Sequence, residues 1–394
     1  MPSLPQDHTG ARIQRLRKER HLTQQALCDL AQVPYSTLTK TEQGTLPASP
    51  RLIAAVARAL RVEVATVTGQ PYTTELRADE LDVLISPIRE ALDVYDLGAD
   101  PEIAPRPGRL LEDDAQGLLV AVRAGEIKRT ATQLPGLILE QTTAAHLADT
   151  TEGWLLLASY YRTAYDVTSK LGHPDLATIA LSRMEWAAER GSGAVIGGMY
   201  RYMRALTYLR TGQYRTGDRL IRMGLGVLEQ AEPGRERDVL TGQLHLGAAV
   251  MAARAKDRDG ADGHLEEADR IAAATGDASD VHWLSFGPTN VAVHRVSVLA
   301  ELDEYGRAAQ VGKAVPMPKS WPASRKSHHF AELARAQMWD GQLEESFTNL
   351  VRARKAAPQQ ARYHQTVRET YDGLEAAKRQ LPDSFLSYGS WLHV

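Results

Sequence analysis

The sequence predicts an all-α protein, and three observations point to this class. Alanine, leucine, arginine and glutamate dominate the 394 residues, and these residue types favour helices. The strict apolar/polar alternation of β-strands is absent after residue 108. Instead, helix–turn–helix units recur there, with turns about 38 to 47 residues apart. A chain of this length exceeds one ordinary hydrophobic core, so we expect several domains or a repeat array.

Composition limits the kind of protein further. The hydrophobic content of 43% and the charged content of 24% are typical of soluble globular proteins. Cys28 is the single cysteine, which excludes an internal disulfide and a cysteine-based zinc site. The opening MPSLPQDHTG has no basic-then-apolar signal pattern, and apolar runs such as residues 154–158 are far too short for a membrane span. We therefore expect a cytoplasmic protein that does not contact a membrane.

The charge is unevenly distributed along the chain. Residues 1–72 contain nine lysines and arginines and five acids, a net charge of +4, which leaves −7 for the remainder of a chain of total charge −3. A basic head on an acidic body indicates that the head alone contacts a polyanion, although chance asymmetry is the alternative.

Five short helices are predicted in the first 70 residues. The first is a basic amphipathic helix over residues 11–20, and Thr23 is placed to cap the second. The third runs from about residue 35 to residue 43 and ends at a glycine. Ser49 and Pro50 form a strong start signal for the fourth, and a short fifth helix covers residues 63–68.

The segments LTQ, TLTKTEQG and SPRLIAAVARALRV, in this order, resemble the helix-turn-helix domain of Xre/Cro-type phage repressors over residues 11–69. In that fold the third helix enters the DNA major groove, which displays a distinct pattern of donors and acceptors for each base pair. The resemblance implies base contacts from the third helix and phosphate contacts around it, with a solvated helix face as the alternative for each residue. The expected base-contacting residues are Tyr35, Ser36, Thr39 and Lys40, and the phosphate-contacting residues are Gln24, Thr37 and Thr45.

The resemblance also implies an ion pair between Arg17 and Glu42 that ties the first helix to the end of the third. If this pair is buried, removing one partner would cost about 3–5 kcal/mol. Two positions depart from the pattern. Gln32 stands in the turn where the family usually has glycine, which implies about 1 kcal/mol of strain or a different turn. Thr41 stands where the family usually has an apolar residue.

The rest of the chain divides into a connection and a repeat region. Residues 73–96 have the apolar spacing of one connecting helix, and the proline-rich GADPEIAPRPG over residues 98–108 is the expected linker. The predicted domains are therefore a helix-turn-helix domain over 1–72, a connecting helix and linker over 73–110, and a repeat domain over 111–394. The repeat turns are expected near Gly125, Gly172, Gly212, Asp259, Asp303 and Gly341.

This repeat region resembles lengthened, degenerate tetratricopeptide repeats. Such repeats stack into a right-handed α-solenoid with a concave inner surface, and an irregular helical bundle is the alternative. Residues 358–381 are expected to form a capping helix. The first helix of each pair would line the concave surface, and the segment HWLSFGPTNVAVHRV over 282–296 could add an aromatic-walled pocket, with a plain core role as the alternative. The candidate ligand-binding residues are Arg162, Tyr202, Gln243, Trp283, Phe286, Asn290, His294 and Arg335.

No pattern of catalytic chemistry is found. G-x-S-x-G, Walker and G-x-G-x-x-G loops are missing, and the glycine cluster GSGAVIGG over 191–198 follows no strand. His328 and His329 lack a third metal ligand at helical spacing. We expect no enzyme activity, no catalytic residue, no metal and no cofactor.

Taken as a whole, the chain resembles helix-turn-helix plus tetratricopeptide regulators of Gram-positive bacteria, and its composition resembles actinobacterial members. The resemblance implies a transcription regulator of quorum-sensing type that binds a double-stranded DNA operator. It would do so as a homodimer on an inverted repeat and would respond to a signalling peptide or a small molecule. The alternative is an adaptor that recruits a protein partner constitutively and senses no small ligand.

Overall fold

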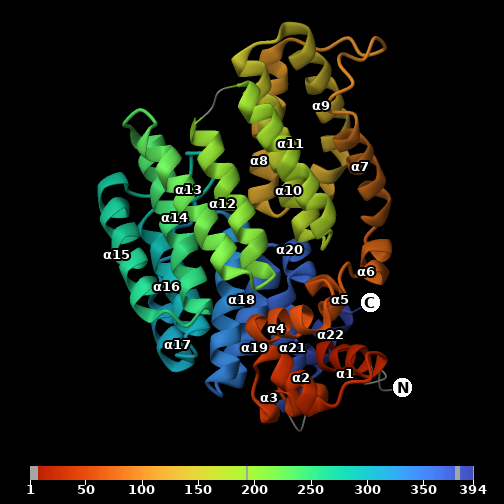
Figure 1. Cartoon of the computed structure of the whole chain (residues 1–394), viewed down its shortest axis with the longest axis vertical. Helices are drawn as coiled ribbons and strands as arrows, with labels where there is room; N and C mark the ends of the chain where they lie inside the picture. Colours follow the sequence, from red (N-terminus) through yellow and green to blue (C-terminus); the bar gives the residue numbers. More distant parts are fainter. Residues whose placement is uncertain (1–7, 192–193, 378–381, 394) are drawn as a thin grey trace.

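The computed structural model describes residues 8–191, 194–377 and 382–393. Three segments discussed above lie partly outside these ranges. They are the opening MPSLPQDHTG, the glycine cluster over 191–198 and the end of the capping helix predicted over 358–381. Twenty-two α-helices and one 3-10 helix form in the described residues (Figure 1). The one β-type pairing among them is an isolated bridge between Ala278 and Phe286. The predicted all-α class is thus confirmed.

The N-terminal domain consists of five helices around one small core. Thr23 and Ser49 cap the second and fourth helices as predicted, because their hydroxyls accept from the amides of Ala26 and Leu52 at 3.1 and 3.2 Å. Leu38, at the middle of the third helix, is fully buried in the core. The helices are α1 (Thr9–Glu19), α2 (Gln24–Ala31), α3 (Tyr35–Glu42), α4 (Pro50–Leu60) and α5 (Val64–Thr68).

The connection after this domain is broken, so the prediction of one helix over residues 73–96 is wrong. It consists of α6 (Thr73–Ala78), the 3-10 helix η1 (Asp82–Leu84) and α7 (Ile85–Asp93). Glu80 adopts a left-handed conformation with φ 56°, which stops α6. Pro87 has no amide hydrogen and is tolerated only near a helix start, which is where α7 places it. The segment 94–107 is non-helical, in agreement with the predicted proline-rich linker.

Six helical hairpins follow, each closed by a tight turn. Five of the six turns lie at the predicted positions, and four of these contain a glycine with positive φ. The turn expected near Asp259 lies earlier, at residues 255–257, because Asp257 caps the next helix by accepting from the amide of Gly260 at 3.0 Å. The hairpins are α8 (Gly108–Ala124) with α9 (Ile127–Ala148), α10 (Thr151–Lys170) with α11 (Pro174–Arg190), α12 (Ala194–Arg210) with α13 (Tyr214–Glu229), α14 (Arg235–Arg254) with α15 (Arg258–Thr275), α16 (Pro288–Glu301) with α17 (Tyr305–Ala314), and α18 (Ala323–Trp339) with α19 (Leu343–Ala356).

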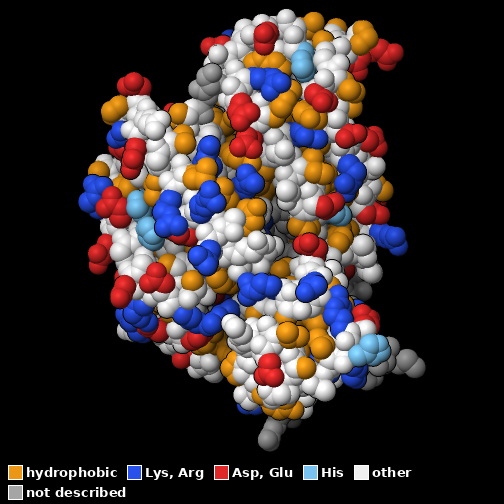
Figure 2. Space-filling view, viewed as in Figure 1, with side chains coloured by type: hydrophobic (Ala, Val, Ile, Leu, Met, Phe, Trp, Pro, Cys, Tyr) orange, Lys and Arg blue, Asp and Glu red, His pale blue; other side chains and the backbone are white. Residues whose placement is uncertain are grey.

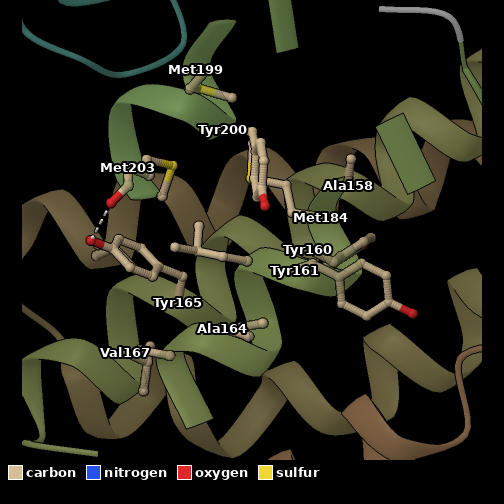
Figure 3. Packing of buried hydrophobic residues seen from close by; sticks show 14 of the residues in the cluster. Ala158, Tyr160, Tyr161, Ala164, Tyr165, Val167, Met184, Met199, Tyr200 and Met203 are labelled. Atoms are coloured by element: carbon tan, nitrogen blue, oxygen red, sulfur yellow. Dashed lines mark hydrogen bonds between the residues drawn. The ribbon is translucent and has the colours of Figure 1, made fainter. Parts of the chain in front are cut away.

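Large side chains fill the space between successive hairpins. Tyr160 and Tyr161 on α10 are fully buried, and Met184 on α11 packs among them (Figure 3). The hydroxyl of Tyr165 donates to the carbonyl of Met203 at 3.4 Å, which joins α10 to α12 (Figure 3). The cluster therefore runs continuously from one hairpin to the next, as expected for units that cannot bury their apolar faces alone.

The array curls far enough for α18 to contact α8, so the first helices of the hairpins enclose a common interior. The predicted capping helix is two helices, α20 (Pro358–Tyr363) and α21 (Gln365–Ala377), because His364 between them has an extended backbone. The last helix, α22 (Asp383–Leu392), packs on α21 through Phe385, which stacks on Tyr371 with ring centroids 4.4 Å apart. These C-terminal helices lie next to the N-terminal domain (Figure 1).

Candidate nucleic-acid interface and ligand cavity

A buried ion pair holds α3 against α1. Arg17 Nε and Nη2 donate to the two carboxylate oxygens of Glu42, each at 2.7 Å, and a third guanidinium nitrogen donates to the carbonyl of Leu22 at 2.8 Å. The side chains are 9% and 0% exposed. The hydrogen bond to Glu42 raises the pKa of Arg17. A fork-to-fork pair of this kind fixes both distance and orientation, so it sets the direction in which α3 projects.

The two helices cross at a glycine. A Cβ atom at Gly10 would lie 1.7 Å from the carbonyl oxygen of Thr41, so only glycine permits this approach. Thr41 itself is 1% exposed, and its hydroxyl has no hydrogen-bond partner in the described residues. This is the position where the family pattern has an apolar residue.

The turn between α2 and α3 is strained. Gln32 adopts the left-handed conformation, with φ 55° and ψ 49°, at the position where the family pattern has glycine. A residue with a Cβ atom in this region costs about 1 kcal/mol relative to glycine. The turn therefore has the conformation that glycine usually adopts in the family pattern, and Gln32 adopts it with strain.

Gln24 is held in a short hydrogen-bonded row. Its amide nitrogen donates to Glu42 at 2.8 Å, and its amide oxygen accepts from the hydroxyl of Tyr35 at 3.2 Å. One amide hydrogen of Gln24 remains for a phosphate oxygen, since a primary amide has two. The row connects the expected phosphate contact, the expected base contact and the buried ion pair.

The remaining residues of α3 differ in what they present to the surface. Ser36 and Lys40 are exposed, and Tyr35 is 49% exposed. Thr37 is half-buried. The hydroxyl of Thr39 is buried without a partner in the described part of the chain, so its methyl group is the part left to contact a base.

Thr45 lies just beyond the end of α3. Its hydroxyl and its amide donate to the carbonyl of Lys40 at 3.1 and 3.0 Å. Both donors of Thr45 therefore cap the end of α3 in this structure, and its phosphate contact stays a prediction.

The face of the domain opposite α3 docks on the helical array. Arg58 on α4 donates to the carbonyl of Gly212 in the α12–α13 turn at 2.9 Å, and Ala54 packs against the same glycine. On α1, the Thr9 hydroxyl donates to Glu369 on α21. Burial, together with nearby Asp372, raises the pKa of Glu369 to about 7. These contacts leave the second and third helices on the outside of the molecule (Figure 1).

Residues 8–68 match the family model described as a helix-turn-helix domain. The N-terminal domain is therefore of the helix-turn-helix class, and the match supports a DNA-binding regulator. No curated protein and no solved structure matches the chain. None of the helices in the described part of the chain combines the length and apolarity that crossing a bilayer requires.

Four of the eight predicted ligand-binding residues form a buried row inside the array. The amide of Gln243 on α14 donates to the hydroxyl of Tyr202 on α12 at 2.7 Å and accepts from Asn290 on α16 at 3.2 Å. The ring of His294 bonds to the carbonyl of Asn290 at 2.8 Å. Burial lowers the pKa of His294 to about 3, so it is neutral at physiological pH. These side chains satisfy one another across the first helices of three hairpins.

Two other predicted residues have structural partners. Phe286 is fully buried and packs on α14 at Gly242. Arg335 on α18 pairs with Glu332 at 2.7 Å and with Glu301 at 3.0 Å. In this structure neither offers a free group to a ligand, and the plain core role accounts for Phe286.

Arg162 and Trp283, the last two predicted ligand residues, line one cavity of about 450 Å³ between α8, α10, α12 and the segment before α16. The indole nitrogen of Trp283 donates to Gln116 at 3.0 Å across its mouth. Half of the other lining residues are apolar and half are polar or charged. They are Leu119, Ala158, Ser159, Ile196, Met199, Arg235, Glu236, Asp280, Val281 and His282.

Sequence reasoning missed three cations of the interior: Arg123, which lies near Arg162, and Lys170 and Arg325, which lie near Arg123. Arg123 and Lys170 stand at the end of the first helix of a hairpin, one or two residues before the turn region. A search for cations at that repeat position would have found them. Arg325 is in the first turn of α18 and reaches the others only because the array curls back on itself.

Proposed function

We propose that this protein is a transcription regulator that binds a specific double-stranded DNA operator through α3, while the helical array senses an effector and sets the geometry of a homodimer. The observation that supports this most is the orientation of the helix-turn-helix domain. Its reading helix faces outward, and its opposite face is attached to the array by Arg58 and Thr9. A rigid attachment of this kind would let the array control where the reading helix lies.

Charge supports the DNA-binding part of the proposal. The head has a net charge of +4. Lys and Arg side chains continue from its upper edge over α12 and α13 (Figure 2). Cationic surfaces of this kind attract the phosphate backbone over a distance and accelerate association. The exposed arginines of these elements include Arg51 and Arg58 on α4, Arg61 just after it, Arg204 and Arg210 on α12, and Arg215 and Arg219 on α13.

A dimer follows from the size of the reading domain. One helix-turn-helix domain contacts too few base pairs for useful specificity, and paired domains usually read half-sites about one helical turn apart. The operator is thus expected to be an inverted repeat. The resemblance to helix-turn-helix plus tetratricopeptide regulators suggests that the array forms the dimer contact, that the protein is a cytoplasmic bacterial regulator, and that it has no enzyme activity.

Selection of bound sequences from random duplex DNA with the purified chain tests this proposal. We expect an inverted repeat, with a spacing that reports the distance between two reading helices. Failure to bind any duplex at low ionic strength would contradict the proposal. An operator that is bound identically with and without every extract or peptide tested would favour the constitutive adaptor instead.

A further inference from the structure

Four cationic side chains converge on the interior enclosed by the array. Arg123 lies on α8, Arg162 and Lys170 on α10, and Arg325 on α18. They are close enough to repel one another, since Arg123 is repelled by Arg325 and Arg162, and Lys170 by Arg123 and Arg325. The nearby carboxylate is Asp166, which attracts all of them except Arg325. The four cations therefore exceed the negative charge that the fold provides at this point.

None of these four cations forms an ion pair within the described residues. There, the Nε atoms of Arg123, Arg162 and Arg325 are buried without a hydrogen-bond acceptor. Arg123 and Arg325 each donate through Nη2 to one neutral oxygen, on Ser285 and Asn290 respectively, so neither receives a counter-charge from these bonds. Arg162 is 6% exposed and makes no side-chain hydrogen bond to any described residue. A guanidinium group without an acceptor is costly to bury, so the arrangement is unfavourable unless something else supplies negative charge.

Arg335 on α18 shows how the same array treats a buried arginine that has carboxylate partners. Although burial acts to lower its pKa, Glu332 and Glu301 raise it. For Arg162 burial dominates and lowers the pKa, and for Arg123 burial followed by repulsion from Arg325 lowers the pKa to about 9. The same fold therefore gives Arg335 two carboxylate partners and gives Arg123 and Arg162 none within the described residues.

Among the charged residues that line the cavity, Arg162 alone has no partner in the described residues. At the mouth, Arg235 pairs with Asp280 at 2.6 Å, and Glu236 contacts the ring of His282. The walls between mouth and floor are mostly apolar, with Leu119, Ile196, Met199 and Val281 among them. The cavity therefore combines an apolar part of its wall with one cation that has no ion-pair partner in the described part of the chain.

We propose that this cavity binds a small organic anion, with an apolar or aromatic body against its walls and one carboxylate or phosphate group on Arg162. Arg123, Lys170 and Arg325 strengthen the positive potential behind Arg162. The volume of about 450 Å³ lies within the range of small-molecule sites. This inference rests on the proposed function, because it names the chemical class of the effector that the array would sense.

The site also lies close to the attachment of the reading domain. Lys170 is two residues before Gly172, whose turn touches Gln70 and Pro71 just after α5. On the next hairpin, Arg210 donates to Ser169 at 2.7 Å and stands two residues before Gly212, the acceptor of Arg58. An anion that draws these helix ends together would move the two turns on which the reading domain sits. Such a ligand regulates only if it prefers one arrangement of the turns.

The test measures the melting temperature (Tm) of the full chain with octanoate, phenyl phosphate and, as the neutral match, octanamide. We expect both anions to raise the Tm by about 3–4 °C at a hundredfold excess over their Kd, and octanamide to leave it unchanged. The anion with the lower Kd identifies the head group as carboxylate or phosphate. An equal response to octanamide would overturn the proposal, because the charge would then contribute nothing.

Variants locate the site. Arg162→Met is expected to lose the response to both anions and to melt at an equal or higher temperature without ligand, because it removes an unpaired buried charge. Arg162→Lys keeps the charge but not the fork, so it should bind the anions about tenfold more weakly. The matched control is Arg201→Met. Arg201 lies on α12, as Met199 of the cavity does, but it is not a lining residue and donates to the carbonyl of Gly197. An unchanged anion response in Arg162→Met would overturn the proposal.

Operator binding is measured separately, by gel shift with and without the anions. If the wild-type chain binds its operator but does not respond to the anions, the proposed anion site is wrong and the proposed DNA-binding function is retained. Anion binding through Arg162 by a chain that binds no duplex would confirm the site and contradict the proposed regulator.

Discussion

Thr41 is a polar residue at a position of the helix-turn-helix domain where the family pattern has an apolar one. Its hydroxyl is buried at the crossing of α1 and α3 without a partner in the described residues. The side chain keeps the shape of valine but has a polar atom that the surroundings do not satisfy. A buried unsatisfied hydroxyl costs about 1–3 kcal/mol.

We therefore expect Thr41→Val to raise the free energy of unfolding by about 1 kcal/mol, because the shape is retained and the unsatisfied group is removed. Urea unfolding of the full chain measures this. Thr41→Ser is the control, since it keeps the hydroxyl and loses the methyl, and it should destabilise. A destabilised Thr41→Val variant would show that the hydroxyl has a partner.

Variants of Lys40 and Gln24 test the proposed division between base contacts and phosphate contacts. Lys40 is an exposed cation on α3, whereas Gln24 is held by Glu42 and Tyr35 at the edge of the helix. Lys40→Ala is expected to weaken binding to the selected operator by about 1–3 kcal/mol and to random DNA much less. Gln24→Ala should weaken both similarly. Gel shifts with the two DNAs decide, and equal losses for Lys40→Ala would count against base reading.

At the scale of helices, the position of α3 depends on how closely α1 can approach it. Gly10 allows the crossing, and the Arg17–Glu42 pair locks it. The two act together, because the pair reaches its bidentate geometry only at this separation of the helices. If α3 reads DNA as proposed, the position of its surface is set by residues of the crossing that are buried in the domain.

Gly10→Ala should therefore be strongly disruptive, since its Cβ would lie 1.7 Å from a backbone oxygen of α3 that cannot move alone. We expect a loss of about 1–3 kcal/mol of stability together with weaker operator binding. Gly117→Ala on α8 is the matched control, because its Cβ meets open space and alanine should add about 0.5–1 kcal/mol there. A neutral effect of Gly10→Ala on both stability and DNA binding would contradict the role given to this crossing.

For the whole molecule, buried histidines make stability depend on pH. Burial lowers the pKa of His294 to about 3 and that of His329 to about 4. The unfolded chain binds protons at these sites below about pH 6.5, and the folded chain does not. Their contribution to stability is therefore complete above pH 6.5 and is lost as the pH falls. Burial also lowers the pKa of His173, His245, His264, His282, His328 and His364.

Lowering the pH from 7.5 to 5.5 should consequently lower the Tm by about 5–10 °C, as measured by calorimetry. His294→Gln should reduce this dependence, and His21→Gln, at an exposed position, should not. Glu369 acts in the opposite direction, because its raised pKa means that the folded chain keeps a proton between about pH 4.5 and 7. Burial also raises the pKa of Glu375, which acts in the same direction. A Tm that rises on acidification would mean that these two carboxyls outweigh the histidines.

The array should matter for DNA binding as well as for sensing. Residues 1–72 alone are expected to bind the operator at least tenfold more weakly than the full chain, with a smaller salt dependence, because a single reader contacts fewer phosphates. Fluorescence anisotropy over a series of salt concentrations measures both quantities. Equal affinity and equal salt slope would remove the reason to propose a dimer held by the array.

Local signals predicted much of the architecture. Thr23 and Ser49 cap the helices that they were expected to cap, and Gly125, Gly172 and Gly212 lie in hairpin turns with positive φ. These features depend on neighbours a few residues away, so the sequence itself contains the information. The break at Glu80, and the helix start just before Pro87, differ from the prediction because apolar spacing alone suggested one continuous helix.

The candidate ligand site was predicted only in part, for a physical reason. Arg162 and Trp283 reach one cavity, whereas Arg335 found carboxylate partners on its own helix and on α16. Whether an arginine is paired depends on residues far away in the chain, which repeat periodicity does not specify. For the same reason, the sequence did not indicate that Arg123 and Arg325 lie near this site.

The sequence by itself determined the all-α class, the helix-turn-helix domain and the succession of hairpins, because capping, periodicity and turn chemistry act over short distances. Only the tertiary structure decided that α18 meets α8, that the reading domain rests on the α12–α13 turn and on α21, and that four cations share one interior. Each of these depends on contacts between residues far apart in the chain, and such contacts exist only once the whole array has packed.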